Sequence, residues 1–299
     1  MMQRLSLPAP AKLNRMLHIV GRRADGYHEL QTLFQFLDRS DMLHFSPRDD
    51  GAIHLAPAIA GVDHDANLIV RAARLLQHAS GTHQGVDIHL DKRLPMGGGL
   101  GGGSSDAATT LLALDRLWSL DLGLPRLAEL GLTLGADVPV FVRGHSAWAE
   151  GIGERLTPVT LDTPWFVVIH PGEEIATPAV FGHPELTRDT PPISMARALR
   201  GGAEQGRAWR NDCEAVVRRL SPDVAHALDW LSAFGPAMLT GTGSCLFCPL
   251  TSERQADRIL RRVGSHWHAF KARGCNTSPL HDALGIHDEW SPMSQYGDA

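Results

Sequence analysis

A glycine-rich segment constrains this chain more than any other part of its sequence. Six of the seven residues 97–103 are glycine, and the exception is Leu100. A backbone without side chains can approach an anion closely, can adopt positive φ and can turn successive N–H groups toward one point. The segment therefore predicts a loop that binds the phosphates of a nucleotide.

The flanking sequence favours this phosphate loop over the alternatives, a structural turn or a flexible linker. Residues 86–90 alternate apolar and polar side chains with the period of a strand, and apolar residues recur at helical spacing over residues 107–118. Ser104 or Ser105 can cap this helix, and Asp106 suits its first turn. Because the positive end of the helix dipole would then meet the anion, we expect a nucleotide triphosphate as the ligand.

Two familiar nucleotide-binding signatures fit less well. A P-loop requires a lysine that the glycine segment lacks. Gly97, Gly99 and Gly102 match the dinucleotide pattern, but such a match is nearly automatic in so glycine-rich a segment. The acidic residue expected about 20 positions further on, after a strand, is also missing, since Asp115 lies in the helical pattern and Asp121 just beyond it. A dehydrogenase that binds NAD through this loop is thus a weaker alternative.

Three ordered motifs resemble those of the galactokinase, homoserine kinase, mevalonate kinase and phosphomevalonate kinase (GHMP) superfamily. The second motif, Pro-x-x-x-Gly-Leu-Gly-x-x-Ser-Ser, stands at residues 95–105, with the first motif at residues 8–14 and the third at residues 239–244. The resemblance covers roughly residues 5–283. Residues 21–33, which contain Asp-Gly-Tyr-His, are similar to the branch whose alcohol substrate carries a cytidine diphosphate group, in non-mevalonate isoprenoid synthesis.

The fold expected from the sequence is α+β. Strand-like residues 166–169 and helical residues 225–234 alternate without a parallel β-α-β rhythm. The resemblance implies two lobes with the active site in the cleft between them, a nucleotide-binding N-terminal lobe and a ferredoxin-like C-terminal lobe; a single domain is the alternative. The expected parts are an N-terminal GHMP kinase ATP-binding domain at 1–155, a C-terminal GHMP kinase domain at 156–285, a mobile polar tail at 286–299, and surface loops at 187–192 and 200–206.

Lys12 and Asp137 are the catalytic residues that the resemblance implies. Lys12 and Asn14 are two apart in an apparent strand, so their side chains share a face, although a lone lysine in a strand is usually just solvated. Asp137 precedes an apolar stretch, where an aspartate is most often a helix cap. By resemblance, Asp137 takes the proton from the acceptor hydroxyl, while Lys12 keeps that carboxylate ionised and reaches toward the hydroxyl.

The resemblance also implies which residues bind the two substrates. Tyr27 would stack on the cytosine, His28 would hydrogen-bond its edge and Phe181 would cover its other face; the alternative is that both aromatic rings belong to the core. Asn14 and Thr177 are further substrate-binding candidates. The nucleotide-binding candidates are Pro95, Met96, Gly97, Gly98, Gly99, Leu100, Gly101, Gly102, Gly103, Ser104 and Ser105, with Asn67 and Lys92 near the adenine.

ATP and Mg²⁺ are the implied cofactors. The hydroxyl of Ser104 or Ser105 is a reasonable contact for the metal, and the sequence assigns no other ligand. Asp106 directly follows this pair, and its carboxylate would repel a triphosphate unless it faces away or meets magnesium. A non-catalytic nucleotide-binding regulator or another GHMP small-molecule kinase is the alternative reading, but a regulator would not need to retain both Lys12 and Asp137.

Composition limits the remaining function classes. The 299-residue chain has a net charge of −5 and no long basic run, so we expect no nucleic-acid partner. No apolar run of membrane-spanning length and no signal peptide is evident, which predicts a cytoplasmic protein without a membrane partner. Cys245 and Cys248 form a C-x-x-C without a second pair, so a zinc or redox site is a weak alternative. The sequence leaves the oligomeric state open.

Overall fold

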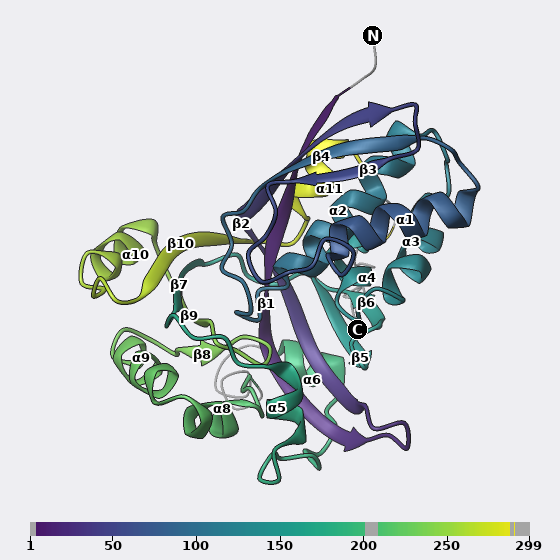
Figure 1. Ribbon diagram of the computed structural model, residues 1–299. Coiled ribbons are helices and arrows are strands. Elements are labelled where there is room, and N and C mark those ends of the chain that lie inside the picture. The colour runs from purple at the N-terminus through teal and green to yellow at the C-terminus, as the bar shows by residue number, and fades with distance from the viewer. Residues whose placement is uncertain (1–3, 201–208, 288–289, 291–299) are drawn as a thin grey trace, which may run out of the picture.

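The computed structural model describes residues 4–200, 209–287 and 290 (Figure 1). The strands are β1 (Leu5–Arg22), β2 (His28–Arg48), β3 (Ile53–Ala56), β4 (Gly85–Asp91), β5 (Ala147–Gly151), β6 (Arg155–Pro158), β7 (Trp165–His170), β8 (Met238–Leu239), β9 (Leu246–Leu250) and β10 (His268–Cys275). The helices are α1 (Leu68–Ser80), α2 (Gly102–Leu117), α3 (Gly123–Leu132), α4 (Val138–Arg143), α5 (Thr177–Gly182), α6 (Met195–Leu199), α8 (Glu214–Leu220), α9 (Pro222–Ser232), α10 (Glu253–Leu260) and α11 (Pro279–Leu284).

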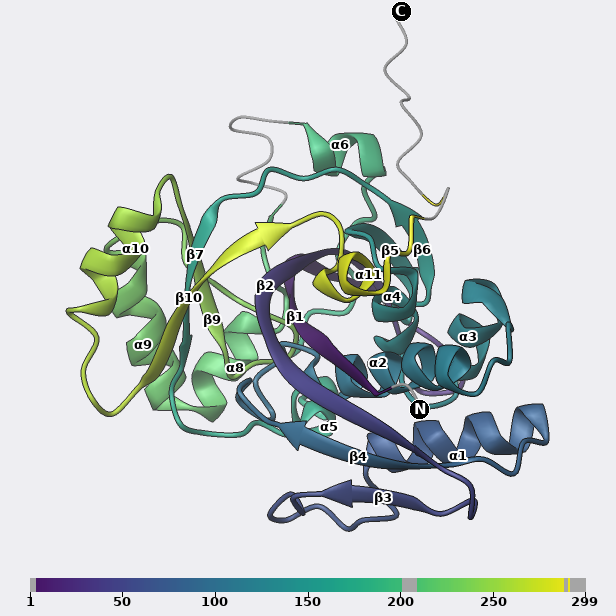
Figure 2. The ribbon, with the colours of Figure 1, turned by 90° about the horizontal axis from the view of Figure 1, so that it is seen from above.

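A long antiparallel hairpin organises the N-terminal lobe. Its strands, β1 and β2, pair from Leu5 opposite Phe45 to Arg22 opposite His28, so the loop at residues 23–27 lies at the far tip. The N-terminal core packs β2 and β4 against α1 and α2, and it includes Phe34, Phe45, Ile69, Ala72, Ile88, Ala108 and Leu111. Figure 2 shows α8, α9 and α10 on one side of this hairpin and α1, α2 and α3 on the other. The hairpin thus belongs to the region where the two lobes meet.

The C-terminal lobe has the ferredoxin-like topology that the resemblance implied. Apart from the short helices α5 and α6 that follow β7, its elements run along the chain as β7, α8 with α9, β8, β9, α10 and β10, and the strand order is β10-β7-β9-β8. Val167 and Ile169 of β7 share a core with the helices, whereas Phe166 and Val168 face Ala11 and other residues of the first lobe. This alternation buries both faces of the sheet.

One sheet of ten strands joins the lobes within the described part of the chain. Gly274 and Cys275 of β10 pair with Leu37 and Phe36 of β2. The predicted boundary after residue 155 falls inside β6, which pairs with β5. Helix α11 lies in the predicted C-terminal segment, yet its apolar residues join the N-terminal core. A cut at one point in the sequence therefore does not describe how the chain packs, and the proposed domain division stays a prediction.

The C-terminal tail and one predicted surface loop fall largely outside the described residues. The ring of Trp290 lies beside that of His145, with centroids 6.1 Å apart, and the guanidinium of Arg143 lies over the Trp290 ring, 5.7 Å from its centroid. Ile286 and Trp290 are partly buried and pack against the N-terminal core, where apolar burial stabilises the contact, and the mobility of the tail stays a prediction. Residues 288–289 and 291–299 of that tail, and residues 201–206 of the loop, lie outside the description.

Most predicted elements are present, with one error at the start of α2. Residues 86–90, 166–169 and 225–234 fall in β4, β7 and α9, although α9 ends at Ser232. Neither Ser104 nor Ser105 caps α2, because the helix already begins at Gly102 with Gly101 at its N-cap in the left-handed region. Asp106 accordingly lies beyond the first turn. None of the described helices is both long enough and apolar enough to span a bilayer.

Candidate active site

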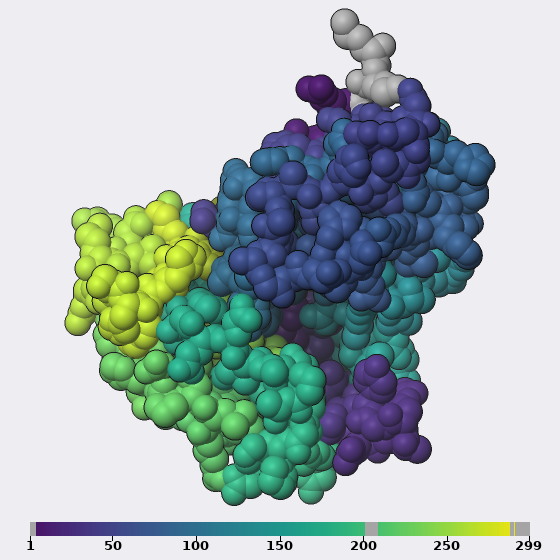
Figure 3. Space-filling view, in the orientation of Figure 1, coloured from purple at the N-terminus to yellow at the C-terminus, as the bar shows by residue number. Residues whose placement is uncertain are grey.

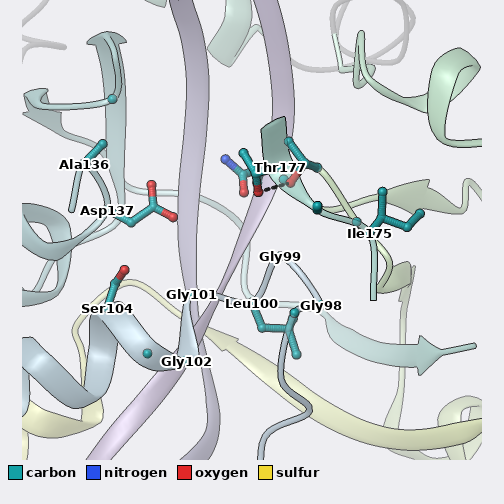
Figure 4. A pocket seen from close by; sticks show the side chains of 18 of the residues that line it. Gly98, Gly99, Leu100, Gly101, Gly102, Ser104, Ala136, Asp137, Ile175 and Thr177 are labelled. Carbon is teal, nitrogen blue, oxygen red and sulfur yellow. Dashed lines mark hydrogen bonds between the residues drawn. The ribbon is translucent and has the colours of Figure 1, made fainter. Parts of the chain in front are cut away.

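A cavity of about 1280 Å³ lies between the lobes and contains nearly all the predicted site residues. The surface is hollowed between the two lobes in Figure 3, and Figure 4 shows part of the lining from close by. The lining includes the predicted residues Lys12, Asn14, Tyr27, His28, Asn67, Lys92, Pro95, Met96, Gly97, Gly98, Gly99, Leu100, Gly101, Gly102, Gly103, Ser104, Asp137, Thr177 and Phe181. Ser105 is the predicted site residue that this lining does not include.

The glycine loop needs glycine for both conformation and space. Gly99 and Gly101 have φ of 74° and 72°, in the left-handed region that other residues rarely adopt. A Cβ atom on Gly99 would lie 2.2 Å from the carbonyl oxygen of Thr240, and one on Gly101 would lie 2.8 Å from the Phe141 ring. The third motif and α4 therefore press directly on this loop, which fixes its backbone.

Backbone hydrogen bonds tie the loop to the first motif and to the residue that directly follows the third motif. The amide of Lys12 donates to the carbonyl of Leu100 at 2.9 Å, and the amide of Cys245 donates to the carbonyl of Gly98 at 3.1 Å. The second motif thus bridges β1 on one side and Cys245, directly before β9, on the other. Residues separated by more than 200 positions in the sequence meet at one end of the cavity.

The ammonium of Lys12 has a partner for each of its three donors. It donates to Oδ1 of Asn14 at 2.6 Å and to the carbonyl of Gly99 at 3.0 Å, and it lies 3.1 Å from Oδ2 of Asp137. The side chain is 3% exposed. Lys12 and Asn14 therefore share a face as predicted, and the reading of Lys12 as a merely solvated strand residue is wrong.

Asn14 is itself held from two directions. Its side-chain Nδ2 donates to Oγ1 of Thr32 at 2.9 Å, and its backbone amide donates to Oγ1 of Thr240 at 2.9 Å. Both hydroxyls come from other segments, β2 and the third motif. These contacts fix the rotamer of Asn14, and through it the position of the Lys12 ammonium.

Asp137 stands at the N-cap position of α4 without acting as a cap. No backbone N–H of the helix donates to its carboxylate. Its side chain is 33% exposed and reaches the cavity beside Ser104 (Figure 4). The helix-cap reading is wrong, since the carboxylate pairs with Lys12 and remains open to a ligand.

Lys92 lies between two buried carboxylates at the edge of the glycine loop. Its Nζ contacts Oδ2 of Asp41 at 2.6 Å and Oδ2 of Asp106 at 2.9 Å. Burial raises the pKa of Asp106 to about 7, with Lys92 opposing the shift and Asp41 adding to it. Burial lowers the pKa of Lys92, but the two carboxylates outweigh it and the net shift is upward. Lys92 therefore offsets the charge of Asp106 next to the predicted triphosphate.

The two serines of the second motif have different environments. Ser104 is partly exposed and lines the cavity, with its side chain near Asp137 in Figure 4. Ser105 is fully buried, and its Oγ has no hydrogen-bond partner. Among the described residues, no group of three or more His, Cys, Asp or Glu side chains could hold a metal ion. Of the two serine hydroxyls, that of Ser104 is the one that a ligand in the cavity can reach.

The opposite end of the cavity contains the aromatic residues. Tyr27, in the hairpin loop, is 61% exposed, so its reading as a core residue is wrong. The rings of His28 and Phe181 stack with centroids 4.9 Å apart and planes inclined by 22°. Thr177, at the start of the same helix as Phe181, shares a 2.9 Å hydrogen bond with Thr242 of the third motif.

Asn67 lines the cavity while its Oδ1 caps α1 by accepting from Ile69.

Sequence reasoning missed Arg188 and Asp41. Arg188 lies in the predicted surface loop 187–192, yet its Nε donates to Nε2 of His28 at 3.1 Å. Asp41, on β2, holds both Lys92 and the backbone amides of Arg93 and Leu94. Neither residue belongs to a sequence motif. The ordinary appearance of an Arg in a loop and an Asp in a strand gives no local signal of these roles.

The C-x-x-C pair does not form a joint site. Cys245 and Cys248 are buried free thiols in different cores, on opposite faces of the C-terminal sheet. Burial raises the pKa of Cys248 to about 11 and that of Cys245 further. Both side chains therefore stay protonated near neutral pH and pack as small apolar groups.

Two family models match the chain. The model of the GHMP kinases N-terminal domain matches residues 67–145, and the model described as GHMP kinases C terminal matches residues 195–269. The first match contains the glycine loop and Asp137. The second covers much of the ferredoxin-like lobe.

Curated relatives and solved structures agree with these matches. A 4-diphosphocytidyl-2-C-methyl-D-erythritol kinase of Chromohalobacter salexigens is 99% identical over 298 residues, which cover 100% of both chains. A kinase of the same name from Pseudomonas paraeruginosa is 58% identical over 281 residues, 94% of this chain and 98% of the relative. A solved structure of 4-(cytidine 5'-diphospho)-2C-methyl-D-erythritol kinase is 36% identical, with a TM-score of 0.76 over 90% of this chain and 99% of that chain. A mevalonate kinase structure, 15% identical with a TM-score of 0.66, shares the fold.

Proposed function

The chain belongs to the GHMP kinase family and is an ATP-dependent kinase, and from this premise we propose that its substrate is 4-diphosphocytidyl-2-C-methyl-D-erythritol. The proposed reaction moves the γ-phosphoryl group of ATP to the 2-hydroxyl of this alcohol, a step of non-mevalonate isoprenoid synthesis in the cytoplasm. The observation that carries the mechanism is the Lys12–Asp137 pair, 3.1 Å apart at the glycine loop. The name shared by the 99% and 58% identical relatives supports the choice of alcohol.

Asp137 acts as the base in the proposed mechanism. Its carboxylate is open to the cavity, makes no helix-cap bond and can accept the proton of a hydroxyl bound in front of it. Lys12 is held by Asn14 and Gly99 and offers its charge to the alkoxide that develops as the proton leaves. Together the two side chains orient the hydroxyl and stabilise the charge that forms on it.

The glycine loop binds the triphosphate. Phosphoryl transfer depends mainly on in-line placement and on neutralising the charge of the transferred group. The fixed backbone of residues 97–103 supplies N–H groups, and the N-terminus of α2 adds the positive end of its dipole. Asn67 and Lys92 line the same cavity, which supports our expectation that they lie near the adenine.

Mg²⁺ fits the residues at this end of the cavity. Magnesium usually takes one or two protein oxygens and completes its shell with phosphate oxygens and water. The hydroxyl of Ser104 is a protein oxygen that lines the cavity. When bound, the ion would neutralise charge on the triphosphate. We therefore assign Ser104, rather than the buried Ser105, as the serine on the metal side.

The end of the cavity that contains Tyr27, His28 and Phe181 recognises the cytidine, and we call it the base end after the nucleobase. Tyr27 offers an exposed ring for stacking on one face of the base, Phe181 offers a ring for the other face, and His28, whose ring is stacked on Phe181, offers its edge for a hydrogen bond to the base. Asn14 and Thr177 supply polar groups between these rings and the catalytic pair. Stacking of a base on an aromatic ring contributes about 1–3 kcal/mol. An alcohol substrate without a nucleoside would leave these rings unused.

ADP release with purified protein, ATP and Mg²⁺ tests the proposal. The cytidylyl alcohol is compared with mevalonate, homoserine and galactose, and wild type is compared with Asp137→Ala. Asp49→Ala, in an exposed turn after β2, is the matched control. We expect turnover of the cytidylyl alcohol alone, lost in Asp137→Ala and kept in the control. Turnover of another alcohol would move the chain to a different branch, and ATP binding without any turnover would favour a regulator. Thermal protection by NAD but not ATP would favour a dehydrogenase.

A further inference from the structure

Arg188 connects the two segments that carry the aromatic residues of the base end. Its Nε donates to Nε2 of His28 at 3.1 Å, at the start of β2. Its terminal nitrogens donate to the carbonyls of Phe181 and His183, each at 2.8 Å, and of Leu186 at 3.0 Å. The guanidinium therefore satisfies carbonyls at the C-terminal end of α5 and holds the ring of His28 beside that of Phe181.

The hydrogen bond from Arg188 determines which ring nitrogen of His28 carries the proton. A guanidinium stays protonated and has only donors, so Nε2 of His28 must accept with its lone pair. The remaining proton of the neutral imidazole is then on Nδ1. Burial lowers the pKa of His28, and the positive charges of Arg188 and Arg22 lower it further, which keeps the ring neutral. His28 therefore has one N–H donor, Nδ1, for a ligand.

The geometry leaves Nδ1 as the polar edge of His28 for the cavity. One face of the ring stacks on Phe181, and Nε2 is turned to Arg188. His28 lines the cavity, whereas Arg188 lies behind it and outside the described lining. Cytosine has an acceptor at N3, whereas uracil has an N–H there. A donor fixed at Nδ1 complements the first base and opposes the second.

We propose that Arg188 is a positioning residue that locks His28 as its Nδ1–H tautomer and thereby selects a cytosine nucleotide over a uracil nucleotide. This inference rests on the proposed function, since it concerns the base of the same substrate. Arg188 acts through His28 and the backbone of α5 and does not touch the nucleotide. With uracil, the Nδ1–H donor of His28 would face the N3–H donor of the base. His28 cannot change to its Nε2–H tautomer while it contacts Arg188, because Arg188 has no acceptor for that proton.

The tautomer can be read without any substrate. In protein with ¹⁵N-labelled histidine, the ring nitrogen shifts of His28 are assigned by their loss in His28→Asn. We expect a protonated Nδ1 and an unprotonated Nε2 near pH 7.5 in the wild type, and a shift toward Nε2–H in Arg188→Ala. Arg210→Ala is the matched control, because Arg210 contacts Thr190 in the same loop without touching His28.

Nucleotide selection is read by binding of CDP and UDP. We expect the wild type to prefer CDP, the preference to fall about tenfold in Arg188→Ala, and Arg210→Ala to keep it. An Nε2–H tautomer in the wild type, an unchanged tautomer in Arg188→Ala or equal binding of CDP and UDP would each overturn the proposal. An equal loss of preference in Arg210→Ala would also overturn it, since loop docking would then suffice. ADP release with the cytidylyl alcohol reports separately on the proposed function, so the two can fail independently.

Discussion

The two ends of the cavity are built in different ways. We call the end that contains Lys12, Asp137 and the glycine loop the transfer end. There the Lys12 side chain is 3% exposed, each of its three N–H donors has a partner, and glycines with positive φ determine the conformation of the neighbouring backbone. At the base end, Tyr27 is 61% exposed on a hairpin loop, and His28 and Phe181 come together from separate segments. The transfer end is therefore buried and tightly packed, whereas the base end consists of aromatic rings from separate segments, one of which is largely exposed.

This difference corresponds to what each end must do. Phosphoryl transfer requires reacting atoms to be placed within a fraction of an ångström, which a packed backbone provides. Recognition of a base relies on stacking area, which tolerates a partly exposed ring. We therefore expect changes at the transfer end to lower kcat and changes at the base end to raise KM.

The largest effect is expected for Asp137→Asn. Loss of the base should lower kcat by about 10²- to 10⁴-fold with little change in KM for the cytidylyl alcohol. Steady-state kinetics measures both constants, and a thermal melt shows whether the variant is folded. If a folded Asp137→Asn protein kept the kcat of the wild type, Asp137 would not be the base. The two ends of the cavity would then not differ in function as proposed.

Gly99→Ala tests whether the transfer end is as rigid as its packing indicates. The new Cβ would meet the carbonyl of Thr240 at 2.2 Å on a backbone with φ of 74°, so we expect a loss of about 1–3 kcal/mol in stability and weaker protection by ATP. Gly103→Ala is the control for stability, because Gly103 is helical and its nearest neighbour would be 3.5 Å away. Equal losses of stability in the two variants would argue against a fixed loop.

Tyr27→Ala probes the base end. Loss of about 1–3 kcal/mol of stacking should raise KM for the cytidylyl alcohol roughly 5- to 150-fold at nearly constant kcat. The melting temperature should stay near that of the wild type because the ring is 61% exposed. A fall in kcat with KM unchanged would mean that this ring takes part in placing the reacting hydroxyl.

The smallest change in activity is expected for Asp106→Asn. The carboxylate pairs with Lys92, so its removal should leave ATP affinity unchanged or slightly raised. A large loss of ATP affinity would instead identify Asp106 as a residue on the metal side.

Asp106→Asn should also alter the pH dependence of stability. The folded pKa of Asp106 is raised from 3.8 to about 7, so the folded state holds a proton that the unfolded state has released. Its stabilising contribution is complete below about pH 4 and is lost as the pH rises to about 7. Thermal melts across this window should show a smaller decline for Asp106→Asn than for the wild type. Equal slopes would place the titration on another group.

The glycine loop and the shared face of Lys12 and Asn14 could be predicted because their determinants are local, whereas the catalytic roles of Lys12 and Asp137 came from the family resemblance. A run of glycines between a strand pattern and a helix pattern predicts a loop. The spacing of Lys-x-Asn in a strand places both side chains on one face. The start of α2 was predicted too late, since a glycine N-cap leaves no side-chain signal. Pairing of Asp106 with Lys92 also depends on Asp41, which lies more than 50 residues earlier on a strand.

The base end and the closing of the fold depended on contacts that the sequence does not display. Tyr27 and Phe181 were found through the family resemblance, but the partnership of Arg188 with His28 joins positions 160 residues apart. The return of α11 to the N-terminal core likewise follows from long-range packing of Leu280 and Leu284. Periodicity reveals which residues are apolar, but not which distant surface will cover them.

³¹P NMR of the products formed from ATP, Mg²⁺ and 4-diphosphocytidyl-2-C-methyl-D-erythritol tests directly whether the chain transfers phosphate to the 2-hydroxyl with Asp137 as the base. We expect ADP together with a new phosphate monoester on the 2-hydroxyl of the alcohol, formed by the wild type and not by Asp137→Asn. Inorganic phosphate in place of the monoester, or a monoester that forms at an equal rate in Asp137→Asn, would contradict this expectation.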